Sequence, residues 1–457
     1  MKNKIIITEE YKTFLKEFIL LFLPLVLQNM ITLSVNLADN VMLGRYSEAA
    51  LAGVTAVNQI QFIYQQILVG VGDGLVIIAA QYWGKRQTGK IMAVSSAAMR
   101  FSVVVMAAFF CILSVFPEEL TRLFSPDRAI IAEGVAYLSI VKYTYLIFGF
   151  TSVLLATLRS MKIVSIALVL STAAFAINVF LNWILIYGNL GASAMGAKGA
   201  AIATLIARVA ELIILLFYII KKGGLLKVSL KSFFHINKDI SKDYFRICLP
   251  VIFMQSLWGL NNAVQTAILG QTSSAAITAN SMASNLFLLV KIGAVGAASA
   301  ANVMIGHAIG MGNIPEVKKD AKRFQIIFLV IGLLSTLILF VLIEPILSLY
   351  SFSRESADLS RQFLYILCFV IFGMSYQMPV NAGIIKGSGD MKYFVKLDLI
   401  SIWGIVIPVS FLLAFVAKAP PVVVVASLNA DQIFKCLPAF IKVNYGSWIK
   451  KLTRDEA

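Results

Sequence analysis

Long apolar segments alternate with short polar ones along the whole chain. Each apolar segment runs for about 20 residues, the length that an α-helix needs to cross the hydrocarbon core of a membrane. The pattern therefore predicts twelve membrane-spanning helices. Their expected bounds, to within several residues at each end, are 18–40, 50–74, 92–115, 134–156, 164–187, 196–220, 246–269, 276–300, 323–345, 361–384, 394–416 and 422–443.

Composition indicates the same class of protein. Hydrophobic residues make up 59% of the 457 positions and charged residues 14%, and the mean hydropathy is +0.86. Soluble domains carry about 25% charged residues, so this chain lacks the polar side chains to cover a water-exposed globule. Its first residues are mixed in charge and contain no small-residue cleavage site, so we expect no cleavable signal peptide.

Lysine and arginine gather in alternate loops. The net charge of +16 would suggest nucleic acid as a partner in a soluble protein. The positive-inside rule explains it better and predicts that both termini face the cytoplasm, with no nucleic-acid partner. The basic positions on the expected cytoplasmic side are Lys85, Arg86, Lys90, Arg159, Lys162, Lys318, Lys319, Lys322, Arg323, Lys450, Lys451 and Arg454.

The two halves of the chain repeat each other. Pro24 and Pro250, and Gly44 and Gly270, are separated by the same 226 positions, and "LGRYSEAAL" matches "LGQTSSAAI" at this offset. Six helices per half give both halves the same orientation, related by an axis along the membrane normal. This is the architecture of a secondary transporter with two rocking halves.

A lysine-rich polar segment between the sixth and seventh helices marks the division. We expect an N-terminal six-helix lobe over residues 1–222, a cytoplasmic linker over 223–244 and a C-terminal six-helix lobe over 245–457. The fold class predicted is an all-α polytopic membrane protein made of two six-helix bundles.

Several function classes lack their residues in this sequence. No G-x-x-x-x-G-K-[ST] motif is present, so an ion gradient must drive any uphill transport. Two histidines and four scattered cysteines suit neither a metal-dependent enzyme nor a disulfide framework, so we expect no enzyme and no cofactor. A passive channel would need a ring of pore-lining charges, which the pattern does not show.

Asp39 closes the first apolar segment, beside Asn36. A charge within a membrane costs several kcal/mol or more unless it is paired or hydrated, so such residues usually face a cavity. The carboxyl group could bind a proton or, with amide oxygens nearby, Na⁺; alternatively it is solvated at a helix end. Asn178 and Asn182 lie four apart on one helix face and could share hydrogen bonds with Asp39 or simply join helices.

In the second half, Asp398 is the strongest acidic candidate. It lies near the expected cytoplasmic start of the eleventh helix, where an interfacial role is the alternative. Gln255, Asn261 and Asn262 on the seventh helix could line the same lobe.

The other charges within apolar segments are of two kinds. Lys142 and Lys291 have no partner nearby in the sequence, and either a cavity or a snorkelling role stays open for them. Aromatic residues such as Trp258 could attract organic cations or simply pack. Two pairs can neutralise themselves along a helix and are interpreted as structural: Arg208 with Glu211, and Asp431 with Lys435.

A combination of motifs resembles one family. The segments are "LPLVLQN", "LADNVMLGRYSEAALAGV", "AQYWGKRQ", "INVFLNWILIYG", "LPVIFMQSLWGL" and "IIKGSGDMKYFVKLDLISIWGIVIP". Along its whole length the chain resembles the multidrug and toxic compound extrusion (MATE) transporters. The resemblance implies a V-shaped pair of six-helix bundles that expel drugs or metabolites in exchange for Na⁺ or H⁺.

The resemblance also assigns residues. Asp39 matches the family's acid on helix one, Asn178 and Asn182 its N-x-x-x-[DN] pair on helix five, and Asp398 an acid of related members on helix eleven. One position departs: where relatives carry the acid of an "N-E-x-x-W" pattern, this chain has Gln255. Glutamine cannot ionise, so ion coupling is expected at Asp39 and Asp398.

We therefore expect an antiporter, coupled to Na⁺ or H⁺, that exports drugs or other organic, cationic metabolites by alternating access. The expected partners are a small organic substrate and membrane lipid, and the expected state is a monomer in the inner membrane. Flipping of a lipid-linked saccharide or another lipid is the alternative, favoured by Lys142 and Lys291. The expected site residues are Asp39, Asn36, Asn178, Asn182, Asp398 and Gln255, with Asp39 and Asp398 as Na⁺ ligands if Na⁺ couples.

Overall fold

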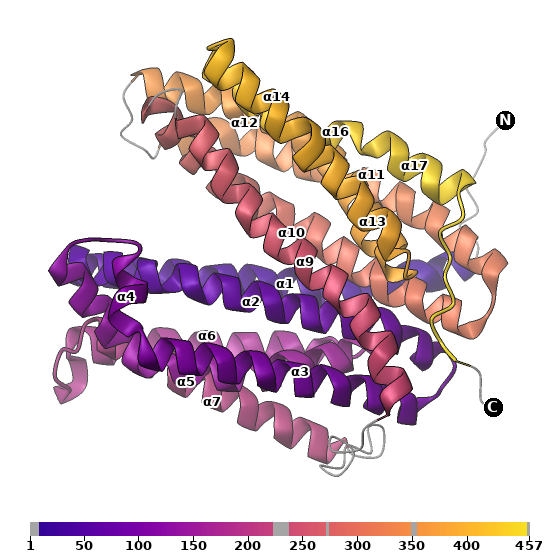
Figure 1. Cartoon of the computed structure of the whole chain (residues 1–457), viewed down its shortest axis with the longest axis horizontal. Coiled ribbons are helices and arrows are strands. Elements are labelled where there is room, and N and C mark those ends of the chain that lie inside the picture. Colours follow the sequence, from indigo (N-terminus) through magenta and orange to yellow (C-terminus); the bar gives the residue numbers. More distant parts are fainter. Residues whose placement is uncertain (1–8, 223–236, 271–273, 349–353, 455–457) are drawn as a thin grey trace. The chain divides into compact units, whose positions relative to one another are not determined.

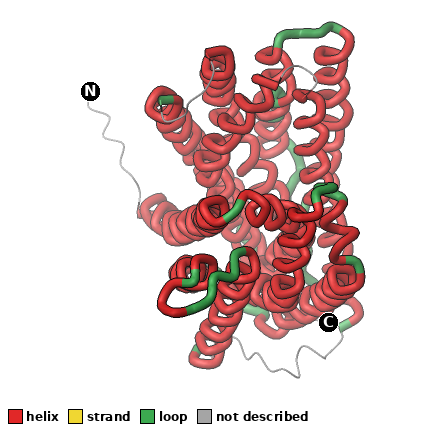
Figure 2. The backbone as a smooth tube through the Cα atoms, turned by 90° about the vertical axis from the view of Figure 1, so that its left-hand side faces the viewer, coloured by secondary structure: helices red, strands yellow, loops and turns green. Residues whose placement is uncertain are grey.

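The computed structural model describes residues 9–222, 237–270, 274–348 and 354–454. Within these ranges the chain consists of helices and connecting loops, and it contains no strand (Figure 2). Twelve helices in the described part are long and apolar enough to cross a membrane. The predicted fold class, an all-α polytopic membrane protein with twelve spanning helices, is confirmed.

The helices of the first half cover most of its length (Figure 1). They are α1 (Glu9–Tyr46), α2 (Glu48–Gly84), α3 (Thr88–Val115), the short α4 (Pro117–Arg122), α5 (Arg128–Ser160), α6 (Ser165–Tyr187) and α7 (Ala197–Lys221), with a 3₁₀ turn at Asn189–Gly191. Side chains cap the starts of two of them: Ser47 accepts a hydrogen bond from a backbone N–H group of α2, and Asp127 accepts one from a backbone N–H group of α5. Gly188, with φ of 76°, ends α6 in the left-handed conformation.

The helices of the second half are less regular. They are α9 (Lys238–Gly270), α10 (Ser274–Met311), α11 (Ile314–Leu347), α12 (Arg354–Met378), α13 (Met391–Asp398), α14 (Ile407–Phe411), α15 (Pro421–Leu428), α16 (Asp431–Phe434) and α17 (Cys436–Tyr445). Three π-helical segments continue them: Pro379–Ile385 after α12, Leu399–Val406 after α13 and Leu412–Val416 after α14. The twelfth expected span is thus three short helices rather than one.

Most helices extend beyond the apolar segments that predict them. Helix α1 begins at Glu9 rather than near residue 18, and its first turns carry a Lys12–Glu9 ion pair of 2.8 Å. A 38-residue helix is about 57 Å long, whereas the hydrocarbon core is about 30 Å thick. The apolar pattern therefore locates the membrane-embedded part of each helix, and the polar ends continue the same helix outside it.

The chain divides into two compact units whose boundaries fall inside helices. The first unit is Leu27–Ser256, and the second unit is Met1–Val26 with Leu257–Ala457. Helices α1 and α9 therefore contribute to both units, and each changes unit a few residues after its internal proline, Pro24 or Pro250. The lobe boundaries expected at residues 222 and 245 stay a prediction, and most of the expected linker (223–236) lies outside the described residues.

In the first unit, the first half of α9 packs closely on α2. A Cβ added at Gly74 would lie 2.9 Å from the Cα of Cys248, and one added at Gly70 would lie 2.9 Å from the Cα of Ile252. The Tyr244 hydroxyl donates to the carbonyl of Val71 at 3.1 Å. Two glycines one turn apart thus let the backbones of α2 and α9 approach, as small residues do between membrane helices.

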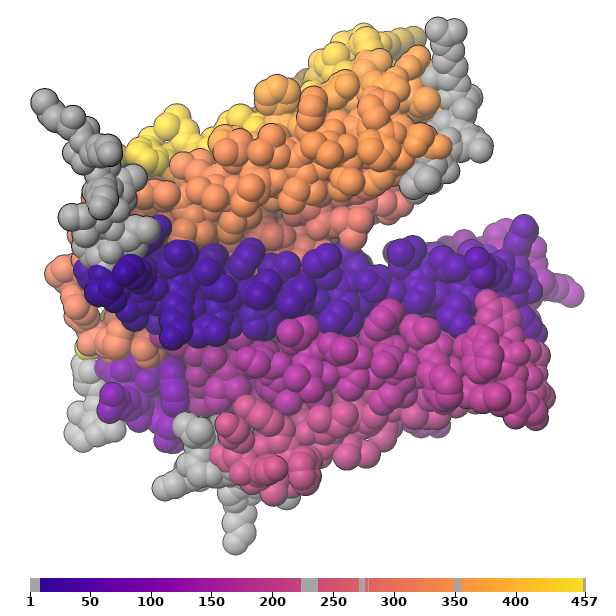
Figure 3. Space-filling model, turned by 180° about the vertical axis from the view of Figure 1, so that it is seen from behind, coloured from indigo at the N-terminus to yellow at the C-terminus, as the bar shows by residue number. Residues whose placement is uncertain are grey.

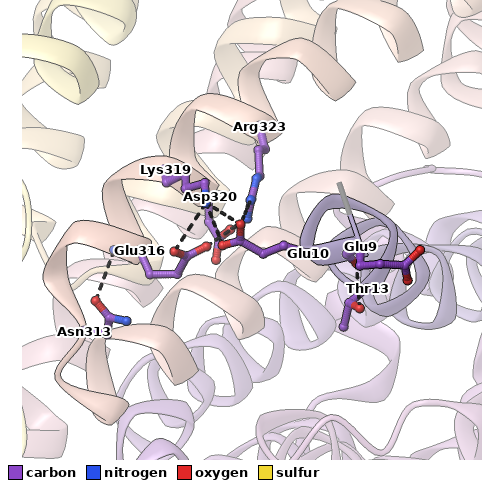
Figure 4. Close-up of polar contacts among 8 residues, drawn as sticks. All are labelled: Glu9, Glu10, Thr13, Asn313, Glu316, Lys319, Asp320 and Arg323. Carbon is purple, nitrogen blue, oxygen red and sulfur yellow. Dashed lines mark hydrogen bonds and ion pairs between the residues drawn. The ribbon is translucent and has the colours of Figure 1, made fainter. Parts of the chain in front are cut away.

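In the second unit, the first half of α1 packs on α11. Phe14 and Phe18 lie edge-on to Phe324, with ring centroids 4.9 and 5.8 Å apart. At the N-terminal ends of both helices, charged residues form a network around Glu10 (Figure 4). Its ion pairs join Glu10 to Lys319 and Arg323, and Arg323 also to Glu316 and Asp320.

The glycine contact between α2 and α9 can be tested by one added methyl group. Gly74→Ala places a methyl against the backbone of α9, and overpacking of this kind costs about 1–3 kcal/mol. Gly89→Ala is the matched control, because nothing lies within 4 Å of a Cβ there. In thermal unfolding of the detergent-solubilised protein, Gly74→Ala should lower the midpoint and Gly89→Ala should not. Equal midpoints would contradict the close approach.

Candidate functional site

A polar network lies at Asp39 in the first unit. The amide nitrogen of Asn182 donates both to the Asp39 carboxylate and, at 3.1 Å, to the side-chain oxygen of Asn178. The amide nitrogen of Asn178 in turn donates to the Thr204 hydroxyl at 3.2 Å. The network thus joins α1, α6 and α7, and Figure 3 shows α6 lying along α1.

The helix pattern explains this arrangement. Asn178 and Asn182 are one helical turn apart, so both face α1 and α7 from the same side of α6. Near the end of α6, the Tyr187 hydroxyl donates to the carbonyl of Met42 at 2.7 Å and fixes α6 against α1. One asparagine amide therefore contacts the carboxylate inside an apolar segment, and a second asparagine holds the first.

A second charged group lies close to this network. Arg208 pairs with Glu211 at 2.7 Å and lies 5.2 Å from the ring centre of Phe148. Arg208 also interacts electrostatically with Asp39, as does the buried Tyr137. Asp39, Glu211 and Arg208 together carry two negative charges and one positive charge when all are ionised.

One polar atom of the network has no partner. The side-chain oxygen of Asn182 is buried and accepts no hydrogen bond within the described part of the chain. A buried acceptor of this kind generally has a partner in the working protein. A protonated Asp39 carboxyl group would donate a hydrogen bond to this oxygen once the Asn182 amide group has rotated by half a turn. A hard cation bound by the carboxylate and amide oxygens would be a partner of another kind.

The structure leaves two of the expected site residues outside this network. Asn36 is exposed and, in the ranges described, makes no hydrogen bond to Asp39. Gln255 is partly buried on α9 at the edge of the first unit, and no hydrogen bond joins it to Asp39 among the described residues. The structure thus assembles Asp39, Asn178 and Asn182, and it adds Thr204 and Tyr137, which the sequence analysis did not identify.

The second unit contains a separate network around Lys435. The Lys435 ammonium contacts Asp398 at 2.7 Å and Asp431 at 2.9 Å, and Lys435 and Asp431 are both buried. The interpretation of Asp431 and Lys435 as a pair along one helix is therefore incomplete, because Lys435 also binds the expected acidic candidate, Asp398. Helix spacing predicts contacts within a helix but not contacts between helices.

This second network continues through side-chain amides. Gln432 donates to Asp431 at 2.8 Å, Gln377 donates to Gln432 at 2.7 Å, and Asn381 donates to Gln377 at 3.1 Å. The side-chain oxygen of Asn381 is buried without a partner in the described part of the chain. Asn381 lies in a π-helical segment, and Asp398 directly precedes another; such segments frequently occur at functional sites.

Both networks therefore place one more carboxylate than cation inside apolar helices. A proton or a monovalent cation at either one would neutralise this excess. Among the described residues, no group of three or more His, Cys, Asp or Glu side chains is placed so that it could hold a metal ion.

Comparison with known proteins identifies a family and several relatives of this chain. The sequence model of the MatE family matches residues 24–184 and 250–412. A probable multidrug resistance protein NorM of Thermotoga maritima is 24% identical over 98% of this chain and 96% of its own. The probable multidrug resistance protein YoeA of Bacillus subtilis is 24% identical over 87% of each chain.

Solved structures show the same fold. A MOP superfamily transporter from Pyrococcus furiosus superposes with a TM-score of 0.84 at 17% identity, over 94% of each chain. An outward-facing multidrug resistance MATE transporter of the MOP superfamily superposes with a TM-score of 0.84 at 18% identity, over 94% of this chain and 95% of its own.

The Lys435 network makes a prediction about stability. Lys435→Met leaves Asp398 and Asp431 in a buried place without their cation, and breaking a buried pair in this way costs about 3–5 kcal/mol. The variant should unfold at a clearly lower temperature in detergent. The triple variant Lys435→Met, Asp398→Asn, Asp431→Asn removes the charges together and should regain much of the loss. An unchanged midpoint in Lys435→Met would argue against the ion pairs.

Proposed function

The chain belongs to the MatE family of multidrug and toxic compound extrusion transporters, whose model matches it over residues 24–184 and 250–412, and from this membership we propose that it is an ion-coupled exporter. It exchanges Na⁺ or H⁺ for drugs or other organic, cationic metabolites by alternating access. The relatives named as multidrug resistance proteins support the substrate class. The Asp39 network supports the coupling and carries the proposal.

Coupling follows from competition for one carboxylate. An ionised Asp39 attracts an organic cation, whereas a proton or Na⁺ on Asp39 removes that attraction. The unpartnered oxygen of Asn182 stabilises the occupied state, as a hydrogen-bond acceptor for the protonated carboxyl group or as a ligand for Na⁺. Because the ion and the substrate cannot both neutralise Asp39, entry of one favours release of the other, which is the requirement for antiport.

Asp398 is the second coupling candidate, and its surroundings differ. Lys435 already contacts it at 2.7 Å, so a cation at Asp398 must share the carboxylate with this ammonium. We therefore propose Asp39 as the main coupling residue and Asp398 as a residue that modulates the second unit. Gln255 supplies an amide but no charge, so its role is restricted to hydrogen bonding with a substrate that contacts it.

Topology, location and partners complete the proposal. Alternate basic loops support both termini in the cytoplasm and insertion in the inner membrane. The protein then works as a monomer with a small organic substrate and membrane lipid as partners, with no nucleic acid and no resident cofactor.

A lipid flippase is the second candidate, and one observation favours it. Lys142 and Lys291 lie in membrane-spanning helices over aromatic rings, Lys142 at 5.6 Å from Phe110 and Lys291 at 4.8 Å from Trp258. Cations at these positions suit a phosphate-bearing substrate. This observation concerns positions outside both acidic networks, so it does not replace the exporter proposal.

Export from proteoliposomes tests the coupling. A fluorescent cationic dye should leave the vesicles under an imposed Na⁺ gradient or an imposed pH gradient, and the effective gradient identifies the ion. Asp39→Asn should reduce this export by about tenfold or more, because an amide neither takes up a proton nor carries charge. Asn36→Ala, one turn away on the same helix and outside the network, is the matched control and should export like the wild type.

Asp398→Asn should act differently from Asp39→Asn. Because Lys435 retains Asp431 as a partner, this variant should fold and should slow export by a smaller factor than Asp39→Asn, measured in the same vesicles. Export that neither gradient drives would reject ion coupling. Export that survives Asp39→Asn unchanged would reject Asp39 as the coupling residue.

A further inference from the structure

Lys291 lies at the middle of a long membrane-spanning helix. Helix α10 runs from Ser274 to Met311, so Lys291 is about 25 Å from its start and about 30 Å from its end at 1.5 Å per residue. A lysine side chain extends about 6 Å and can snorkel only from near a helix end. Lys291 therefore places its ammonium group within the membrane and not at its surface.

No acidic side chain neutralises this ammonium. In the part of the chain that the structure describes, no carboxylate lies within ion-pair distance of Lys291. The ammonium lies 4.8 Å from the ring centre of Trp258 on α9, a cation–π contact that holds it in position but supplies no opposite charge. An ionisable residue within a membrane without a counter-charge marks a substrate or ion pathway by default.

A polar cavity lies between the same two helices. Its volume is about 260 Å³. Its lining offers hydroxyl and amide groups and no acidic residue: Thr266 and Leu269 of α9, and Ile277, Asn280, Ser281, Ser284 and Asn285 of α10. Hydroxyl and amide N–H groups donate hydrogen bonds to anions, and the volume is near the lower end of the range for small-molecule pockets.

Helix geometry places Lys291 on the cavity side of α10. Ile277, Ser284 and Lys291 are seven residues apart, which is two helical turns, so they lie on one face. Long side chains on a helix lean toward its N-terminus, and for Lys291 that is the direction of Ser284 and the cavity. The ammonium is thus within about one helical turn of the cavity lining.

The facing side of α9 has the same pattern. Trp258, Asn262 and Thr266 are spaced by four residues and form one stripe. Thr266 lines the cavity and Trp258 contacts Lys291, so the two stripes run antiparallel from the cavity to the lysine.

The internal repeat shows that this charge belongs to the second half alone. Gly70 and Gly296 keep the offset of 226 positions, and at that offset Lys291 corresponds to Gln65 and Trp258 to Thr32. The first half thus has a neutral amide and no indole where the second half has a cation held by an aromatic ring. A structural requirement common to both halves does not explain the lysine.

We propose that Lys291, held by Trp258, and the α9–α10 cavity form a binding site for the anionic group of an organic ligand, a carboxylate or a phosphate. The cavity hydroxyls and amides hydrogen-bond the anionic group or its polar neighbours, and Lys291 neutralises the charge within the membrane. Two sources carry this chemistry, a small organic anion and the phosphate of a lipid headgroup.

This inference deepens the proposed function by adding an anionic group to the substrate class, and its test is independent of coupling. Binding is measured by calorimetry on the full-length protein in a neutral detergent, without any ion gradient. The probes are benzoate and phenyl phosphate, with uncharged benzamide as the control ligand. Phosphatidic acid, added at low concentration in the same detergent, tests the lipid source.

Lys291→Gln installs the side chain that the first half carries at the equivalent position. It should weaken binding of the anionic probes by about tenfold or more, the loss expected for one charge-assisted hydrogen bond. Lys291→Arg keeps the charge and should retain most of the affinity. Lys198→Gln removes an exposed lysine of α7, in the first unit and away from the cavity lining, and should bind as the wild type does.

The outcomes separate the ligands and the proposals. Saturable binding of benzoate or phenyl phosphate that depends on Lys291 supports the site with a small organic anion, and binding of phosphatidic acid alone supports it with a lipid headgroup. The proposal is overturned if no anionic probe binds saturably, or if Lys291→Gln binds the probes as tightly as the wild type does. Anion binding without ion-driven dye export would reject the coupling proposal and leave this site standing.

The thermal midpoint distinguishes binding from folding. Replacing an ammonium that lacks an opposite charge by a neutral amide removes a desolvation cost, so Lys291→Gln should unfold at the same or a higher temperature than the wild type. A lower midpoint together with lost binding would mean that Lys291 is structural and would overturn its assignment to the ligand.

Discussion

The hydrocarbon core of a membrane offers no water to polar groups, and this constraint decides where function can lie in this protein. Backbone groups satisfy it by forming helices. Side chains must find partners in other helices, which is why Asn182 contacts Asp39 and why Lys435 joins two carboxylates. Each of the two acidic networks also contains one buried amide oxygen, of Asn182 or Asn381, that has no partner in the described part of the chain.

The two acidic networks solve the same problem in different ways. In the first unit, the amide of Asn182 contacts Asp39, and Arg208 pairs with Glu211. In the second unit, Lys435 is bound directly to both carboxylates. An amide stabilises a carboxylate without neutralising it, whereas the Lys435 ammonium neutralises one of the two carboxylates that it contacts. The internal repeat therefore supplies one scaffold, and the local side chains give its halves different chemistry.

A further charged side chain of the second unit, Lys291, differs from both networks. Lys291 has an aromatic neighbour, Trp258, and no carboxylate within ion-pair distance among the described residues. A carboxylate beside this ammonium would satisfy it internally and leave nothing for a ligand.

The sequence by itself determined the membrane class, the twelve spans, the internal repeat and the candidates Asp39, Asn178, Asn182 and Asp398. These follow from local composition and from helical periodicity, because a membrane helix satisfies its own backbone and needs no distant partner. Only the tertiary structure decided which of the candidates meet. It joined Asp39 to Asn182 but not to Asn36, and it bound Asp398 to Lys435, since contacts between helices depend on how the helices pack. It also introduced π-helical segments into the last spans, and it formed the α9–α10 cavity, which no spacing along one helix could predict.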